Sequence, residues 1–171
     1  MVVKEEGTQA EIMTLERPMK CPVGPCKCCC FQEMTMSANG RTLGKIEEQM
    51  FCCVPRMVIK NESSVDIYKV HSPTCCGGMC VNCCAEGNPC GKGCCKVPFH
   101  IFPADQKDTD NGAPHIGKIL KLPKSLMTEL FTDSEAFDIT YPEKATSEQK
   151  ALISGSTVFI NANFFEQDGG E

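Results

Sequence analysis

The 171-residue sequence contains no tryptophan and little aromatic character, since Phe, Trp and Tyr together make up 6% of it. A surface that stacks single-stranded bases needs aromatic rings, so this composition disfavours such a surface. Excess positive charge is also lacking, because 17 lysines and arginines are outnumbered by 22 aspartates and glutamates, for a formal net charge of −5. We therefore expect neither a nucleic-acid partner nor electrostatic attraction to an acidic membrane surface.

Long hydrophobic runs are scarce as well. The start, MVVKEEGTQAEIMTLERP, carries acidic residues early and has no apolar core of a secretory signal, so we expect no export. The most apolar segment, 151–165, would rise about 22 Å as a helix, short of the roughly 30 Å of hydrocarbon in a bilayer. Its serines, threonine and asparagines add to the cost of insertion. This segment is predicted to be a buried helix, not a transmembrane one.

Catalytic motifs are missing too. The three histidines, His71, His100 and His115, each lie in or beside a segment with the composition of a loop. The sequence shows no nucleophile elbow and no glycine loop that could cradle a phosphate. We therefore expect no enzyme that breaks covalent bonds.

Cysteine is the abundant residue, with fifteen in the chain. Five lie in CPVGPCKCCC at 21–30, and eight lie in CCGGMCVNCCAEGNPCGKGCC at 75–95. Without export, cytosolic reductants keep thiols reduced, and an odd number cannot pair completely. Disulfides therefore rank below two other uses, which are metal ligation and covalent lipid attachment.

The remainder of the chain has the pattern of a single, mainly β domain spanning 1–171. Asn39-Gly40 lies between two strand-like segments and predicts a hairpin with a type I′ turn. Alternating apolar residues predict further strands at 11–15, 56–60, 65–70, 97–101 and 137–141. Near the end, Thr146 with Gln149 resembles a capping box, which predicts the start of the apolar helix.

Several strings, in this order, carry a resemblance to a known family: EIMTLERPMKC, CKCCCFQEM, RMVIKNE, IGKI, FTDSEAFDITYP, KALISG and FFE. Together they resemble the phospholipid scramblase family over most of the chain, with one long insertion around 75–95. The resemblance implies a tubby-like β-barrel wrapped around a hydrophobic C-terminal helix. Family members usually have a Pro-rich tail and further strands before this start, so we expect either a partial gene model or a shortened paralogue, in which the barrel is incomplete.

The first cysteine run is interpreted through Cys26, Cys28, Cys29 and Cys30. Adjacent cysteines in an extended segment point to alternate sides, so three in a row do not converge easily on one tetrahedral ion. Unmodified thiols in a loop, or a metal or redox role, are the alternatives. The resemblance implies palmitoylation here, and stable anchoring takes two or more such membrane-binding signals. We therefore expect covalent palmitate to hold the chain on the cytoplasmic face of the plasma membrane.

The second run leaves three interpretations open. Its CxxC and CxxxC spacings could hold zinc, with His71 or His100 as additional ligands. Further acylation is an equal alternative, and a cysteine-rich surface loop without a fixed role is the third. The residues concerned are Cys76, Cys80, Cys83, Cys90 and Cys94.

A calcium site is the last candidate, because DSEAFDITYPEK at 133–144 lies where the resemblance implies an acidic, EF-hand-like segment. A true EF-hand needs a bidentate glutamate at its twelfth position, and Lys144 stands there instead. A weak site built from Asp133, Glu135 and Asp138 is the expectation. The alternative is a solvated acidic turn before a strand.

The resemblance implies ATP-independent, calcium-responsive, bidirectional movement of phospholipids between bilayer leaflets. The alternative function is an acylated, membrane-attached adaptor or lipid-binding module without this activity, and a third is a cytosolic zinc protein built on 75–95. Expected partners are membrane phospholipids, a homo-oligomer and signalling proteins.

Overall fold

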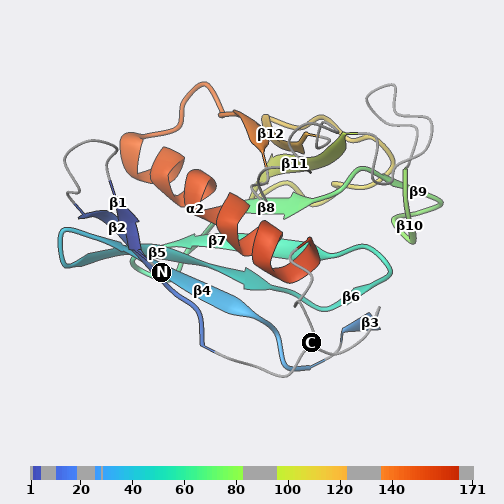
Figure 1. The fold of residues 1–171 in the computed structure, drawn as a ribbon. Coiled ribbons are helices and arrows are strands. Elements are labelled where there is room, and N and C mark those ends of the chain that lie inside the picture. Colours follow the sequence, from blue (N-terminus) through green and yellow to red (C-terminus); the bar gives the residue numbers. More distant parts are fainter. Residues whose placement is uncertain are drawn as a thin grey trace, which may run out of the picture.

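The computed structural model describes residues 2–4, 11–18, 26–27, 29–82, 96–122 and 136–165. Within these residues nine antiparallel strands form one sheet in the order β1-β2-β4-β5-β7-β8-β11-β12-β13. The sheet curls around the long helix α2 (Figure 1). The main strands and the helix are β1 Val2–Lys4, β2 Glu11–Glu16, β4 Glu33–Ala38, β5 Arg41–Glu48, β7 Arg56–Asn61, β8 Asp66–His71, β11 Val97–Pro103, β12 Gly117–Lys121, β13 Phe137–Thr140 and α2 Ser147–Phe164.

Two short two-stranded ribbons lie beside this sheet. Strand β3 (Cys26–Lys27) pairs with β6 (Phe51–Cys52), and β9 (Thr74–Cys75) pairs with β10 (Cys80–Val81). The predicted fold class, mainly β around a C-terminal helix, is confirmed. Within the described residues the sheet has β1 and β13 at its two ends.

The predicted turn between β4 and β5 has the expected geometry. Asn39 and Gly40 adopt φ values of 52° and 74°, and a type I′ turn requires a positive φ at both central residues. In β4 the buried side chains alternate, with Met34 and Met36 facing the core. This hairpin was therefore predictable from adjacent residues alone.

Helix α2 begins where the sequence predicts. The Thr146 hydroxyl accepts a hydrogen bond from the Gln149 backbone, and the Gln149 side chain accepts one from the Thr146 backbone. From residue 151 to 165 every side chain is buried or half-buried. No helix in the described residues is both long enough and apolar enough to cross a bilayer. The prediction of a buried helix is confirmed.

The core lies between α2 and the concave face of the sheet. Phe159 and Ile160 are fully buried in one cluster with side chains of β4, β5, β7 and β11. At Gly155 the helix approaches β4 so closely that an added Cβ would lie 2.5 Å from the sulfur of Met36. A side chain larger than hydrogen at this position would therefore require either the Met36 side chain or the helix to shift.

Candidate functional site

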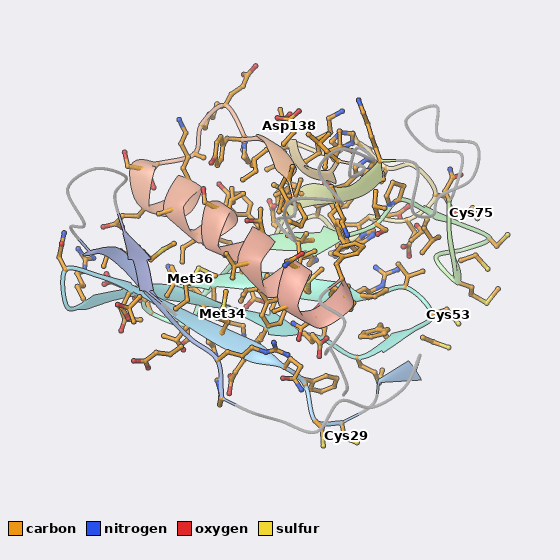
Figure 2. All side chains as sticks on the ribbon, in the orientation of Figure 1. Cys29, Met34, Met36, Cys53, Cys75 and Asp138 are labelled. Carbon is orange, nitrogen blue, oxygen red and sulfur yellow. The ribbon has the colours of Figure 1, made fainter. Side chains whose placement is uncertain are left out.

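The antiparallel topology sends successive connections to opposite ends of the sheet. The β4–β5 and β7–β8 turns share one end, which we call the hairpin end. The segments that precede β4, join β5 to β7 and join β8 to β11 share the other end. Every described cysteine lies at this second end, which we call the cysteine end: Cys26, Cys29, Cys30, Cys52, Cys53, Cys75, Cys76 and Cys80. Figure 2 labels three of them, Cys29, Cys53 and Cys75.

The first cysteine run enters this end through β3. The register places Cys26 directly opposite Cys52 of β6. Cys29 and Cys30 are exposed to solvent just before β4 begins. Cys28 lies outside the described residues. Acyl transfer needs accessible thiols, and Cys29 and Cys30 meet this requirement, while palmitoylation itself stays a prediction.

A second pair of exposed thiols, Cys52 and Cys53, was missed by the sequence reasoning. Their sulfur atoms are 3.7 Å apart, and Cys53 adopts a left-handed φ of 67°. The available signal was the Cys-Cys dipeptide between two predicted strands. Its meaning depends on the strand order, which brings this connection to the same end as the first cysteine run.

The described part of the second cysteine run is the β9–β10 hairpin. Cys75 lies opposite Cys80 in the register, and Cys76 lies in the turn between them. Cys76 and Cys80 are exposed, while Cys75 is half-buried. Cys83, Cys90 and Cys94 lie outside the described residues.

The loop between β11 and β12 fastens this hairpin to the sheet. It leaves β11 at the hairpin end and runs back, so that Asp110 accepts a hydrogen bond of 2.5 Å from Arg56 and one of 3.1 Å from Thr74. The Asn111 side chain accepts a 3.0 Å bond from the backbone of Gly77 in the hairpin turn. Partial burial raises the pKa of Asp110, but its hydrogen bond to Arg56 and the charge of Arg56 outweigh this, and the net pKa is lowered. The loop therefore holds the hairpin through an ionised carboxylate.

His71 is buried beneath the same loop. Its Nδ1 lies 2.7 Å from the carbonyl oxygen of Ser72, and its Nε2 lies 2.9 Å from the hydroxyl of Thr109. A carbonyl only accepts, so Nδ1 carries the hydrogen and Nε2 of the neutral ring accepts from Thr109. Its ring also stacks on the ring of Phe102, with the ring centres 4.8 Å apart. Burial lowers the pKa of His71, so the neutral ring is the stable form.

These contacts bear on the predicted zinc site. Both ring nitrogens of His71 are engaged within the protein, and His100 is buried and stacks on His115 with ring centres 3.9 Å apart. In the described ranges no group of three or more His, Cys, Asp and Glu side chains could hold a metal ion. The zinc interpretation therefore depends on the cysteines between 83 and 95, and it stays a prediction.

The depressed pKa of His71 predicts a loss of stability in mild acid. Below its ordinary pKa of 6.5 the unfolded chain takes up a proton that the folded chain resists, so the free energy of unfolding falls as the pH falls. The slope from this one group is at most about 1.4 kcal/mol per pH unit. We expect His71→Gln, which keeps the polar contacts, to remove this part of the slope between pH 6.5 and pH 5. Urea unfolding at each pH measures it, and equal slopes in both proteins would contradict the assignment.

Of the predicted calcium ligands, Asp133 and Glu135 lie outside the described residues. Asp138 lies in β13 opposite Leu120, and its side chain is exposed. Lys144 is exposed beyond the end of the same strand. An accessible carboxylate is compatible with a weak site, and calcium binding stays a prediction.

Helix α2 ends near the cysteine end. Arg17, just after β2, donates a 2.6 Å hydrogen bond to the side chain of Asn163, and the ring of Phe165 contacts that of Phe99. At the opposite end of the helix, Glu148 forms a 3.3 Å ion pair with Arg41 beside the β4–β5 turn. The helix axis therefore links the two ends of the sheet.

Comparison with known proteins identifies relatives of this chain. The scramblase family matches residues 5–167. The chain is 31% identical to mouse (Mus musculus) phospholipid scramblase 1 over 162 residues, which are 94% of this chain and 43% of that protein. It is 32% identical to cattle (Bos taurus) phospholipid scramblase 2, covering 94% of this chain and 48% of that protein. It is also 32% identical to human (Homo sapiens) phospholipid scramblase 1 over 163 residues, which are 94% of this chain and 44% of that protein.

The chain thus spans a little under half the length of these relatives. No solved structure matches it. The family match covers nearly the whole chain. The chain belongs to the phospholipid scramblase family.

Proposed function

We propose that this protein is a phospholipid scramblase that moves lipids between the leaflets of a bilayer in both directions, without ATP and in response to calcium. This is lipid translocation and involves no bond chemistry. The observation that carries the proposal, beside family membership, is the gathering of exposed thiols at one end of the sheet.

Attachment to the membrane would come from thioester-linked palmitate on Cys26, Cys28, Cys29 and Cys30. Each buried CH₂ contributes about 0.8 kcal/mol, but one acyl chain binds only marginally, so two or more chains are needed for stable anchoring. Clustered thiols supply them together. The acyl chains would insert into the cytoplasmic face of the plasma membrane, which contains the phospholipids to be moved.

Calcium would act through the segment 133–144, with Asp133, Glu135 and Asp138 as the oxygen ligands. Lys144 in place of a bidentate acid keeps the affinity low. Such a site would fill only when the calcium concentration is high.

A second candidate function is an acylated adaptor that binds membrane lipids or signalling proteins without scrambling. It is favoured by the packing of α2, whose residues Phe159 and Ile160 are fully buried against the sheet. A helix held this way keeps these two side chains away from the bilayer. The adaptor would use the same acylated cysteine end.

A liposome assay distinguishes the two functions. The acylated chain, purified from its native cell, is reconstituted with a fluorescent phospholipid in the inner leaflet, and a membrane-impermeant reductant reports lipid that reaches the outer leaflet. We expect lipid exposure with calcium and no ATP, and a clear reduction for Asp138→Asn. Val65→Ser, at the hairpin end, is the matched control and should behave as the parent protein. If bound protein exposes no labelled lipid with calcium, the scramblase proposal is wrong and the adaptor remains.

A further inference from the structure

The turn of the β9–β10 hairpin, residues 76–79, presents an unusual surface. Met79 is 67% exposed and Val81 is 38% exposed. From residue 72 to residue 82 the chain contains no Asp, Glu, Lys or Arg. Met79 and Val81 are two positions apart in this uncharged segment, so together they offer a small apolar surface to an apolar partner.

This turn is held in one conformation. Cys76, Gly77 and Gly78 all adopt positive φ, with the Gly78 backbone donating to Cys75 at 3.1 Å and Asn82 donating to Pro73 at 2.7 Å. The Asn111 side chain secures Gly77 from the neighbouring loop. Because the turn is already ordered, contact of Met79 with a partner costs little conformational entropy.

The turn lies at the cysteine end of the sheet, which has a further exposed apolar residue. Met50 in the β5–β7 connection is 71% exposed, close in sequence to Cys52 and Cys53. The hairpin end provides a contrast. One exposed apolar residue there, Val65, adjoins Asp66 and follows Glu62 by three positions, and a second, Ile116, is 41% exposed. Charges next to Val65 in the sequence make contact with hydrocarbon costly, while residues 72–82 carry none, and the Asp110 carboxylate that lies against Gly78 is paired with Arg56.

We propose that the β9–β10 hairpin inserts its turn directly into the interfacial region of a phospholipid bilayer, with Met79 as the leading side chain. This contact is non-covalent and is separate from the acyl chains. This inference rests on the proposed function in one respect, namely that the cysteine end of the sheet faces the membrane. Two kinds of attachment at one end would set the tilt of the domain as well as its distance from the lipid.

The absence of tryptophan from the chain allows a clean test. Met79→Trp and Val65→Trp each introduce a single tryptophan, at the cysteine end and the hairpin end respectively. The full acylated chains are bound to phosphatidylcholine vesicles, with and without brominated acyl chains. We expect the emission from position 79 to shift to shorter wavelength and to be quenched by the brominated lipid, while position 65 shows neither change.

A kinetic measurement gives the size of the effect. Met79→Asp is expected to speed transfer of the protein from donor to acceptor vesicles roughly tenfold, about 1.4 kcal/mol, because a charged group replaces a lipid-buried methionine. Val65→Asp is the matched control and should leave the transfer rate unchanged. Circular dichroism checks that all variants remain folded.

The outcomes separate this inference from the proposed function. Neutral hydroxylamine cleaves thioesters. If it does not release the vesicle-bound protein, and tryptophan at position 79 is still quenched, the hairpin inference is supported and thioester anchoring is wrong. If position 79 remains in water on vesicle-bound protein, the hairpin inference is overturned. Shielding of position 79 by a cytosolic extract but not by vesicles would overturn it in favour of a protein partner.

Discussion

Replacing Cys26, Cys28, Cys29 and Cys30 together with serine is expected to release most of the protein from cell membranes. The physical reason is the steep dependence of membrane binding on the number of acyl chains. A single chain gives an association constant of only about 10⁴ M⁻¹, while a second chain makes attachment stable. The fourfold variant should retain only the weak, non-covalent contribution of the β9–β10 turn.

The measurement is the distribution of the protein between membrane and soluble fractions of its native cell. Neutral hydroxylamine should reproduce the effect on the parent protein, because it cleaves thioesters without changing the sequence. Cys52→Ser with Cys53→Ser shows whether the neighbouring pair also carries acyl chains. Val65→Ser is the control, and its distribution between the two fractions should equal that of the parent protein. Full retention of the fourfold variant in the membrane fraction would show that these cysteines do not anchor the chain.

Replacing Phe159 with alanine is expected to lower the free energy of unfolding by about 3–5 kcal/mol. Phe159 is fully buried between α2 and the sheet, so the change removes a large apolar contact and leaves a cavity. A domain of this size has about 5–15 kcal/mol of stability in total. The variant should therefore be close to unfolding at physiological temperature.

Urea unfolding followed by circular dichroism measures this loss. Val158→Ala is the matched control, since its half-buried side chain neighbours Phe159 on the same helix, and we expect it to cost only about 1 kcal/mol. Equal and small losses for both variants would show that α2 is not packed on the sheet in solution. Repeating the comparison on vesicles tests whether the helix leaves the sheet when the protein meets lipid.

The elements of the fold were predictable where the signal is local. Asn39-Gly40 tolerates positive φ and therefore specifies the β4–β5 turn, and the side chains of Thr146 and Gln149 satisfy the backbone at the start of α2. Short strands followed from the alternation of apolar residues. The ribbons β3–β6 and β9–β10 were not predicted, because two-residue strands carry no periodicity.

The candidate site was only partly predictable. Cysteine density pointed to Cys29, Cys30, Cys76 and Cys80, which are all exposed or part of an exposed turn. It did not point to Cys52 and Cys53, because two cysteines between strands have no meaning until the strand order is known. Nor did it show that Asp110 would reach Arg56, a residue 54 positions away, to hold the hairpin.

Local sequence was enough to specify the mainly β class, the buried helix and the family, because turns, caps and apolar alternation depend on residues near one another. Which thiols gather at one end of the sheet, and which uncharged turn lies beside them, was settled only by the antiparallel strand order and its register. Those pairings join residues far apart in the chain, and no short stretch of sequence encodes them.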